Sequence, residues 1–432
     1  MKILVVGSGG REHAICRALA TASPPPEIIV APGNPGTAGM ADNVDVAASD
    51  IDGLVELARS LPVDLVIPGP EAPLVAGLAD RLLDAGIPVC GPSGQAAKLE
   101  GSKRFTRELA REAGVPGARF EVVQTVAGLE SAVDGWDGIP VVKADGLAAG
   151  KGVLLPVTRQ ACVDAGTELL EGKLGAAGLT VVLEERLDGV EASLFYACLG
   201  QTAVALPHAR DHKRLHDGDL GPNTGGMGAI SPNPFIEEHD EDIERLVRDT
   251  IITPTLATLE RRGTPYSGFL FAGLMLTSEG PRLLEYNVRL GDPEAQAVLP
   301  RIADGEFLAL CLAVGRGDLE GFELSIDPRP TCAIVLAADG YPDQPRQGDP
   351  IRIADDVHAD DRWLDHAGTR KQNGALVTSG GRVAAVVARG ASAATARAAA
   401  YAGVDMVSFD GMQFRHDIGD ELADDTTVGD NP

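Results

Sequence analysis

The chain has 432 residues and a formal net charge of −26, with 37 Lys and Arg against 63 Asp and Glu. Such an acidic protein is poorly suited to bind nucleic acid without regard to sequence, or to bind an anionic membrane, because both kinds of binding need a basic surface. Six cysteines stand singly, without a C-x-x-C pair, which indicates reduced core thiols. The apolar run in MKILVVG is too short for a signal peptide or a membrane span. We therefore expect a cytoplasmic protein with no nucleic-acid or membrane partner.

Residues 1–100 alternate short apolar strands with helical segments. The strands read KILVV, EIIVA, DLVIPG and IPVCG, and the helices EHAICRALA, IDGLVELARS and LVAGLADRLLDAG. This order predicts a parallel, doubly wound sheet. Ligands of such sheets bind at the carboxyl ends of the strands, where the loops GSGGRE (7–12), APGNPG (31–36) and GPEAP (69–73) lie.

The remainder of the chain is mixed α and β. A helix over GSKRFTRELAREAG, capped by Ser102, leads into a mixed region at 121–190. Strands ASLFYACLG, FLFAGLMLT and PRLLEYNV follow, with a polar glycine-rich loop at 210–228 and helices around 240–262 and 294–315. After the turn-rich DPRPT, short strands and the helix ASAATARAAAYAG predict a small β-rich domain. The acidic tail that begins with DELADD is expected to be disordered.

The first loop resembles a dinucleotide-binding fingerprint, but Glu12 stands where the third glycine belongs. The second strand ends in VAPGN and offers no acid for a ribose hydroxyl, so a dehydrogenase that uses NAD is disfavoured. Arg11, beside a helix N-terminus, suits a single phosphate. A plain tight turn is the alternative.

A second glycine-rich run, GLAAGKG (146–152), lies between IPVVK and VLLPV. These apolar, β-branched flanks predict the tip of a hairpin, and the spacing does not fit a Walker loop. Its backbone N–H groups, with Lys143 and Lys151, can hold phosphates. The alternative is an ordinary glycine-rich hairpin.

Downstream of this hairpin, the segment VVLEERLDGVEAS carries Glu184 and Glu185 at a strand end and Glu191 after a turn. These acids could receive an adenine amino group and ribose hydroxyls. A solvated acidic strand end is the alternative.

The segment LLEYNVRLGDPEAQ (283–296) places Glu285, Asn287 and Arg289 on one face of a strand. A carboxylate and an amide oxygen suit Mg²⁺ that bridges nucleotide phosphates. Arg289 could hold a carboxylate or a phosphate. An exposed polar face is the alternative.

His208, His212 and His216 are spaced by four residues, which raises the question of zinc. The intervening Arg210 and Lys213 oppose a cation, so zinc is disfavoured. The basic cluster suits an anionic ligand instead, and NTGGMG adds backbone donors.

A lysine before a non-Walker hairpin, acids after it and a Glu-x-Asn strand together resemble the ATP-grasp fold, in which two sheets clasp ATP. The motifs GREHA, APGNPGT, GPEAPLV, GSKRFT, VVKADGLAAGKGV, DHKR, GPNTGGMGA and RLGDPEAQ occur here in the order found in the glycinamide ribonucleotide synthetase family. The resemblance runs from residue 1 to about residue 420 and its motifs are specific.

The resemblance implies an α/β protein of ATP-grasp fold, with a doubly wound N-terminal domain and a small β-rich C-terminal domain. The implied units are residues 1–102, a central domain of 103–120 and 191–326, a clasp of 121–190, a C-terminal domain of 327–420 and a tail of 421–432. It implies a monomeric, single-function ligase of purine biosynthesis. That enzyme joins glycine to 5-phosphoribosylamine through glycyl phosphate, using ATP with Mg²⁺ or Mn²⁺.

Site residues follow from the same resemblance. Phosphate and hairpin contacts are implied for Lys103, Lys143, Gly146, Gly150, Lys151 and Gly152, adenine and ribose contacts for Glu184, Glu185, Arg186, Leu187 and Glu191, and metal ligation for Glu285 and Asn287. Catalytic roles are implied for Arg289, Asp211, Lys213 and Asp292. Substrate contacts are implied for Gly9, Gly10, Arg11, Glu12, Gly33, Asn34, Pro70, Glu71, Asn223, Gly225 and Gly226.

Two alternatives stay open at this point. One is a sister ATP-grasp carboxylate–amine ligase or carboxylase that acts on another purine precursor. The other is a nucleotide-binding module without turnover. When the glycine-rich hairpin is read as an ATP-grasp lid, Lys143 is expected to be the fixed phosphate contact, and Lys151 is expected to lie on the lid that closes over ATP.

Overall fold

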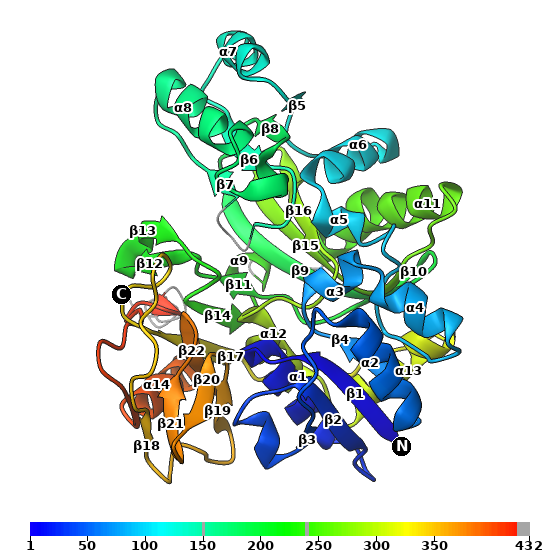
Figure 1. The fold of residues 1–432 in the computed structure, drawn as a ribbon, viewed down its shortest axis with the longest axis vertical. Coiled ribbons are helices and arrows are strands. Elements are labelled where there is room, and N and C mark those ends of the chain that lie inside the picture. The colour runs from blue at the N-terminus through cyan, green and yellow to red at the C-terminus, as the bar shows by residue number, and fades with distance from the viewer. Residues whose placement is uncertain (149–151, 238–241, 421–432) are drawn as a thin grey trace, which may run out of the picture.

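The computed structural model describes residues 1–148, 152–237 and 242–420. Figure 1 shows a unit at the top built from β5–β8, a central sheet below it, and two units side by side at the base. No helix in the described part of the chain is long and apolar enough to cross a membrane. The contacts predicted for Gly150 and Lys151, and the disorder expected of 421–432, lie outside the described residues.

The N-terminal unit is the predicted parallel sheet, in the order β3-β2-β1-β4. Strand β1 lies inside the sheet because its residues 3–6, ILVV, are apolar at every position and are buried on both faces. The elements are β1 (Lys2–Gly7), α1 (Gly10–Ala20), β2 (Glu27–Pro32), β3 (Asp42–Asn43), α2 (Ile51–Ser60), β4 (Leu65–Pro68), α3 (Glu71–Val75) and α4 (Leu78–Asp84).

Two expectations for this unit were wrong. IPVCG is not a strand, because only Val89 pairs with the sheet, through an isolated bridge to Val66. The segment LVAGLADRLLDAG is not one helix, because α3 and α4 are separated at Gly77, whose φ is +86°. A residue with positive φ cannot continue a right-handed helix.

The upper unit, which we call the clasp, is an antiparallel sheet in the order β5-β8-β6-β7. Its elements are β5 (Phe120–Val123), α7 (Val126–Asp134), β6 (Val141–Ala144), β7 (Val153–Leu154), α8 (Arg159–Leu170) and β8 (Val181–Glu184). The predicted hairpin is confirmed, since β6 and β7 pair antiparallel through Val142 with Leu154 and Lys143 with Val153. The clasp has its own core of aliphatic side chains around Leu129, Val142 and Leu183.

The central sheet is antiparallel, in the order β10-β9-β15-β16. Ser102 caps the helix that precedes the clasp, as predicted, because its Oγ accepts the Phe105 N–H at 3.0 Å. The elements are α5 (Lys98–Gly101), α6 (Lys103–Ala113), β9 (Val190–Leu199), β10 (Thr202–Ala205), α9 (Pro234–Glu237), α10 (Asp242–Val247), a π-helical turn (Arg248–Ile252), α11 (Thr253–Arg261), β15 (Ser267–Thr277), β16 (Gly280–Asn287), α12 (Glu294–Val298) and α13 (Glu306–Arg316).

A five-stranded sheet, in the order β11-β14-β17-β22-β19, joins the central and C-terminal regions. Its strands are β11 (Arg210–Asp211), β14 (Gly228–Ser231), β17 (Thr331–Ala337), β19 (Arg362–His366) and β22 (Arg382–Arg389). This sheet therefore contains strands β11 and β14 from the expected central domain as well as strands β17, β19 and β22 from the expected C-terminal domain. Around it lie β12 (Arg214–His216), β13 (Leu220–Asn223), β18 (Arg352–Ile353), β20 (Thr369–Gln372), β21 (Ala375–Thr378), α14 (Ala393–Val404) and β23 (Val407–Ser408).

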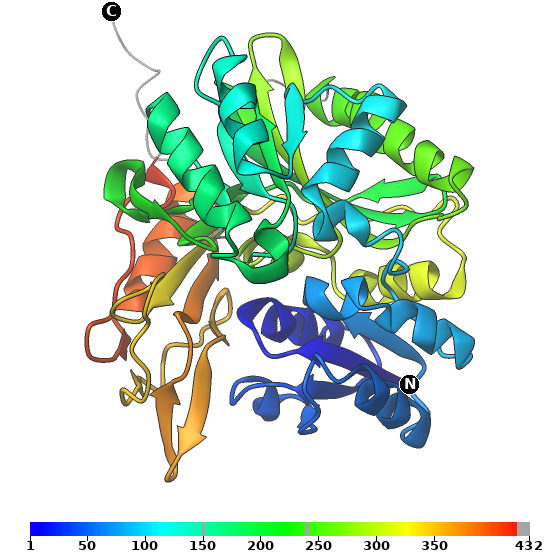
Figure 2. The same cartoon turned by 45° about the horizontal axis from the view of Figure 1, so that its top comes forward.

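The segment 210–228 is not the loop that its polar, glycine-rich composition predicted. Strands β12 and β13 form a hairpin, and β11 and β14 at its two ends pair with each other. The isolated sequence lacks the apolar alternation of a strand, and the neighbouring sheet supplies the pairing. Figure 2 shows this region between the clasp and the C-terminal sheet.

Candidate active site

Three lysines from distant parts of the chain converge below the clasp, each against a carboxylate. Lys103 Nζ lies 2.6 Å from Glu285 Oε2. Lys143 Nζ lies 2.7 Å from Glu184 Oε2, and Lys213 Nζ lies 2.9 Å from Glu191 Oε2. The fold therefore brings together six of the residues that the sequence pointed to.

Glu184 is buried between two cations. Arg107 donates to both of its carboxylate oxygens, from Nε at 2.7 Å and from Nη2 at 2.6 Å, while Lys143 contacts Oε2. Burial opposes ionisation, but Lys143 and Arg107 outweigh it and lower the pKa of Glu184 to about 2. Burial, with Arg107 and Lys103 nearby, lowers the pKa of Lys143. The Glu184 carboxylate thus holds Lys143 in place, which leaves its backbone for the implied contact with adenine.

The other residues implied for adenine lie on the connection from β8 to β9. The backbone of Glu185 pairs with Arg119, whose N–H also donates to the Glu185 carboxylate at 3.1 Å. Arg186 is exposed and Leu187 is half-buried. In the hairpin above them, the Gly146 N–H donates to the Ala177 carbonyl at 3.2 Å. Gly152 precedes β7, and its carbonyl accepts the Ala144 N–H.

Strand β16 presents Glu285 and Asn287 two residues apart, on the same face. The charge of Lys103, with smaller contributions from Lys213 and Lys143, holds the pKa of Glu285 well below its ordinary value against the effect of burial. A permanently ionised carboxylate and an amide oxygen fit a hard divalent cation. Among the described residues no group of three His, Cys, Asp or Glu is arranged to hold a metal ion.

Arg289 lies beyond the end of β16 and points to the N-terminal unit. Its Nη2 lies 2.7 Å from Glu100 Oε1, and its Nε lies 3.3 Å from Glu71 Oε2. Glu100 also accepts the Val288 N–H at 2.8 Å, which fixes the turn after the strand. Arg289, for which a catalytic role was expected, and Glu71, for which a substrate contact was expected, therefore form an ion pair.

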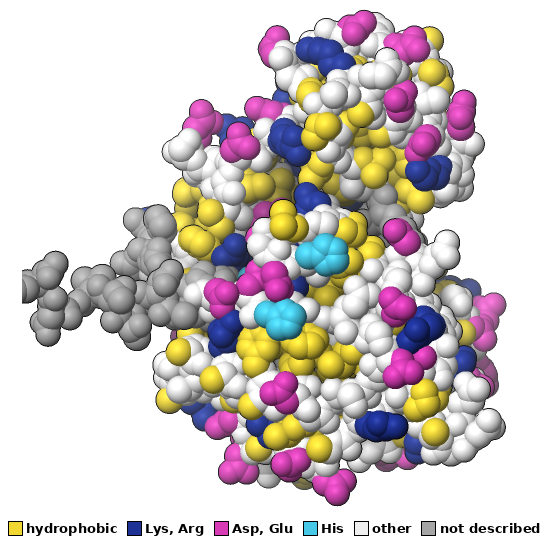
Figure 3. Space-filling model, turned by 90° about the vertical axis from the view of Figure 1, so that its left-hand side faces the viewer, with side chains coloured by type: hydrophobic (Ala, Val, Ile, Leu, Met, Phe, Trp, Pro, Cys, Tyr) yellow, Lys and Arg dark blue, Asp and Glu magenta, His cyan; other side chains and the backbone are white. Residues whose placement is uncertain are grey.

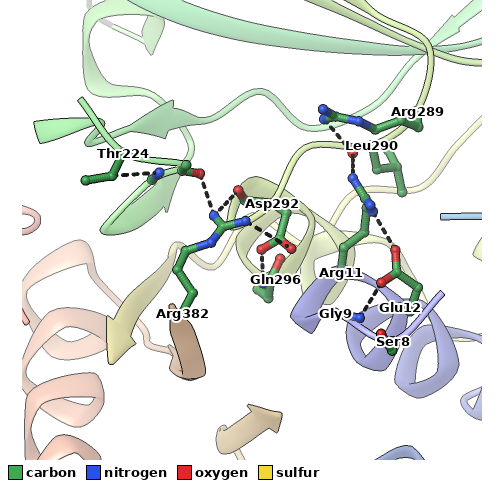
Figure 4. A network of polar contacts seen from close by, with 12 residues as sticks. Ser8, Gly9, Arg11, Glu12, Thr224, Arg289, Leu290, Asp292, Gln296 and Arg382 are labelled. Carbon is green, nitrogen blue, oxygen red and sulfur yellow. Dashed lines mark hydrogen bonds and ion pairs between the residues drawn. The ribbon is translucent and has the colours of Figure 1, made fainter. Parts of the chain in front are cut away.

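Glu12 explains why the first loop departs from a dinucleotide fingerprint. Its carboxylate accepts the Gly9 N–H at 2.5 Å and pairs with Arg11 Nε at 2.7 Å. A Cβ on Gly69 would lie 1.9 Å from Glu12 Oε1. The buried Glu12 carboxylate thus fills the space over the β1–α1 turn and accepts the Gly9 N–H of that turn. Arg11 is buried as well and donates to the Leu290 carbonyl at 3.1 Å (Figure 4).

A cleft of about 360 Å³ lies between the N-terminal unit and the C-terminal sheet. The implied residues Gly9, Gly33, Asn34 and Asp292 line it, whereas Gly10, Arg11, Glu12, Pro70, Glu71, Asn223, Gly225 and Gly226 are not among its lining residues. Sequence reasoning missed Ser8 on the N-terminal wall, and it missed the whole of the other wall, which consists of Ala367, Gly368, Thr369, Ser379 and Arg382.

Asn34 connects the two walls of this cleft through hydrogen bonds. Its Nδ2 donates to the carbonyls of Ser8 and His366, each at 2.9 Å. Its Oδ1 accepts the N–H groups of Gly36 at 2.8 Å and Thr37 at 3.1 Å. All of its strong polar contacts are therefore made within the protein, so Asn34 shapes the cleft.

Arg382 is the cation of the cleft. Its Nη2 lies 3.3 Å from Asp292 Oδ2, and its Nη1 donates to the carbonyls of Gly225 and Asp292. Gln296 donates to the other carboxylate oxygen of Asp292 at 2.8 Å (Figure 4). This network connects the cleft to the glycine-rich segment that contains Asn223, Gly225 and Gly226.

Asp211 differs from the other acids of the site. Its Oδ1 is shielded from solvent and has no hydrogen-bond partner among the described residues. Burial, and then the charge of Glu294, raise its pKa. Gly226 makes room for this carboxylate, since a Cβ there would lie 2.7 Å from Asp211 Oδ1.

Three sequence models of one family match the chain. The N domain of phosphoribosylglycinamide synthetase matches residues 1–100, its ATP-grasp (A) domain residues 101–295, and its C domain residues 331–421. The chain belongs to the phosphoribosylglycinamide synthetase family. This confirms the resemblance inferred from the motifs and the ATP-grasp fold class.

Relatives within this family cover nearly the whole chain. The phosphoribosylamine–glycine ligase of Caulobacter vibrioides is 45% identical over 424 residues, covering 97% of this chain and 98% of that protein. That of Streptomyces coelicolor is 44% identical over 429 residues, covering 98% and 100%. The crystal structure of phosphoribosylamine–glycine ligase from Thermotoga maritima is 34% identical, with a TM-score of 0.84 and coverage of 97% and 100%.

A more distant structure shares the fold alone. The biotin carboxylase domain of 2-oxoglutarate carboxylase from Hydrogenobacter thermophilus has a TM-score of 0.72 at 14% identity, covering 96% of this chain and 91% of that chain.

Charge on the surface is mixed. On the face that Figure 3 shows, acidic and basic side chains are interspersed over the described residues. The basic side chains considered above instead pair with carboxylates inside the site.

Proposed function

We propose that this member of the phosphoribosylglycinamide synthetase family joins glycine to 5-phosphoribosylamine, with ATP becoming ADP and phosphate, as a monomeric cytoplasmic enzyme of purine biosynthesis. One observation carries the proposal. Lys103, Lys143 and Lys213 converge with Glu285 at a point where the clasp and the central sheet meet. A transferring phosphoryl group needs such a concentration of positive charge.

ATP enters by an exchange of ion-pair partners. In the structure Lys103 is paired with Glu285, and Lys213 with Glu191. Triphosphate oxygens take over the lysines, which frees Glu285, while the ribose hydroxyls reach Glu191. Lys143 keeps Glu184 and the Leu284 carbonyl as partners and turns its remaining N–H donor to the phosphates. The backbone of residues 184–187 receives adenine.

Glu285 and Asn287 would hold a divalent cation, Mg²⁺ or Mn²⁺. When bound, such a cation neutralises phosphate charge and orients the phosphoryl group for transfer.

The reaction itself needs no nucleophile from the protein. A glycine carboxylate oxygen attacks the γ-phosphorus, ADP leaves, and glycyl phosphate forms. The amine of 5-phosphoribosylamine then attacks the acyl carbon, and phosphate leaves with one former carboxylate oxygen. The protein positions the reactants and neutralises charge, for which Lys213 and Arg289 are the candidate cations.

The cleft between the N-terminal unit and the C-terminal sheet receives 5-phosphoribosylamine. Arg382 supplies a guanidinium group, and Thr369 and Ser379 supply hydroxyl groups, all of which suit a sugar phosphate. Asp292 holds Arg382 in place at 3.3 Å and borders the segment that leads to the phosphate site. The amine of the substrate can therefore approach the acyl carbon from the cleft.

The test measures ADP release with glycine, 5-phosphoribosylamine or ATP omitted in turn. ADP formation that requires both acceptor substrates, together with a product of the mass of glycinamide ribonucleotide, supports the function. Turnover with bicarbonate or formate in place of glycine would point to a sister ATP-grasp enzyme and contradict it.

A further inference from the structure

The N-terminal unit and the C-terminal sheet meet along α1 and β19, which pack against each other (Figure 1). Part of this contact is an ion pair, in which Arg17 Nη2 lies 2.6 Å from the buried carboxylate of Asp365. Next to it, two histidines meet: His13 of α1 and His366 at the end of β19. Their ring centroids lie 5.8 Å apart. The proposed reaction uses neither imidazole, so the pair needs another explanation.

The buried His13 side chain contacts the backbone of His366. The His366 N–H donates to His13 Nδ1 at 2.8 Å. A backbone N–H can only donate, so Nδ1 of this ring carries no proton. The carbonyl of the same residue accepts Asn34 Nδ2 at 2.9 Å. Both backbone polar groups of His366 are therefore bonded to side chains of the N-terminal unit.

Gly36 gives the two histidines room to meet. A Cβ at this position would lie 2.7 Å from His13 Nδ1 and 2.8 Å from His366 Cβ. The φ of Gly36 is −74°, a value that any residue adopts, so its backbone conformation does not require glycine. What the position excludes is a side chain, which would push His13 and His366 apart.

The residues that follow His366 form the C-terminal wall of the cleft. Residues 367–369 line it directly. The Gly368 N–H donates to the Arg382 carbonyl at 2.9 Å, and the Gly368 carbonyl accepts the Ser379 N–H at 2.8 Å. Arg382 and Ser379 line the same wall. A shift of the His366 backbone would therefore reach the polar groups that the cleft offers to a ligand.

We propose that His13 is a positioning residue for 5-phosphoribosylamine: it sets the place of the His366 peptide, and through that peptide the wall that carries Arg382, without touching the substrate. This inference rests on the proposed function, in which the cleft receives 5-phosphoribosylamine. Asn34 holds the carbonyl of the same residue, so the two side chains together keep the N-terminal wall and the C-terminal wall at a fixed separation.

The role requires a neutral imidazole, and the surroundings of His13 keep it neutral. Burial, and then the charges of Arg17 and His358, lower the pKa of His13 to about 3. Burial, then His13, lower the pKa of His366 to about 4 against the opposing charge of Asp365, and His358 lowers it further. His13 therefore accepts the hydrogen bond throughout the range of about pH 5 to 9.

The test compares His13→Leu with His13→Asn. The two new side chains have nearly the same volume, but only Asn places an acceptor oxygen as many bonds from the backbone as Nδ1. In His13→Leu the His366 N–H loses its partner, and the KM for 5-phosphoribosylamine should rise roughly tenfold. His13→Asn should restore that KM to within about threefold of wild type.

The KM values for ATP and glycine provide the comparison, and both should stay within about twofold of wild type in either variant. His358→Asn is the control, because His358 is an exposed histidine near the pair, and it should leave all three KM values unchanged. An equal rise of the 5-phosphoribosylamine KM in His13→Asn and His13→Leu would overturn the proposal, because the hydrogen bond would then not be the cause.

A side chain added between the two histidines gives an independent check. Gly36→Ala should raise the KM for 5-phosphoribosylamine by a similar factor, because its Cβ meets His13 and His366. Gly39→Ala, whose Cβ has no atom within 4 Å, should leave it unchanged. Since Gly36→Ala keeps the imidazole, it decides the matter should His13→Leu fail to fold. An unchanged KM in Gly36→Ala would overturn the proposal.

Hydrogen exchange of the segment 362–369, followed by mass spectrometry, measures the contact without turnover. Exchange should be faster in His13→Leu and in Gly36→Ala than in wild type and in Gly39→Ala. Faster exchange with an unchanged KM for 5-phosphoribosylamine would overturn the proposal, because the contact would then stabilise the interface without positioning the substrate.

The pH dependence separates positioning from direct contact. The ratio of the 5-phosphoribosylamine KM values of His13→Leu and wild type should be constant from about pH 6 to 9. A ratio that changes through about pH 6.5, the ordinary pKa of histidine, would overturn the proposal, because it would mark His13 as a cation that binds the substrate phosphate. Failure of the proposed function is distinct, because the wild-type protein would then form no ADP that depends on 5-phosphoribosylamine.

Discussion

Replacing Glu184 by Gln should destabilise the clasp by about 3 kcal/mol at neutral pH. The side chain is 2% exposed and is held by Arg107 and Lys143. Its pKa is lowered from an ordinary 4.5 to about 2, and that difference corresponds to about 3 kcal/mol at 1.36 kcal/mol per tenfold change in acidity. Removing one partner of a buried ion pair costs about 3–5 kcal/mol in general, which is of the same size.

The sign of the pH effect follows from the lowered pKa. A carboxylate whose folded pKa is depressed stabilises the protein fully above its unfolded pKa, here 4.5, and loses that contribution as pH falls toward 2. The difference between wild type and Glu184→Gln should therefore be constant above about pH 5.5 and shrink below 4.5.

Urea unfolding followed by tryptophan fluorescence provides the assay. The chain has two tryptophans, and Trp136 lies in the core of the clasp, so a Trp363→Phe background reports on the clasp alone. Glu185→Gln is the matched control, because that neighbouring residue is exposed and should shift stability by less than about 0.5 kcal/mol. Equal stabilities of Glu184→Gln and the control would refute the reasoning.

Three further changes test other parts of the account. Lys103→Met should raise the KM for ATP roughly tenfold or more, because a charged phosphate contact is lost, with glycine KM measured as the comparison. Arg382→Met should raise the KM for 5-phosphoribosylamine by a similar factor and leave the KM for ATP unchanged. A raised KM for ATP with an unchanged KM for 5-phosphoribosylamine would contradict the proposed contact between Arg382 and 5-phosphoribosylamine. Gly226→Ala should lower the melting temperature by several degrees, because the φ of Gly226 is +110° and an added Cβ would clash with Pro293. Gly39→Ala is the control and should leave the melting temperature unchanged, because a Cβ at Gly39 has no atom within 4 Å.

Local features of the fold could be predicted because local chemistry determines them. The Ser102 cap and the β6–β7 hairpin depend on residues within a few positions of each other. The parallel strand β1 was evident from its uninterrupted apolar run. The fourth predicted strand, IPVCG, failed because only Val89 reaches the sheet, and no pattern in five residues reveals how far a neighbour extends.

The candidate site divides in the same way. Glu285 and Asn287 were found because alternation along one strand puts them together. Arg107 was missed, although it lies one helical turn after Lys103, where the i,i+4 spacing could have indicated it. Arg382 comes from a strand 90 residues after Asp292, so its place in the cleft depends on the packing of whole domains, which a single sequence does not display.

The central claim is that the glycine carboxylate is activated by phosphorylation. Turnover of glycine labelled with ¹⁸O in both carboxylate oxygens, followed by mass spectrometry of the inorganic phosphate, tests it most directly. The account predicts that each phosphate released carries an ¹⁸O atom from glycine, in step with ADP. Phosphate that contains only unlabelled oxygen, with glycinamide ribonucleotide still formed, would contradict it.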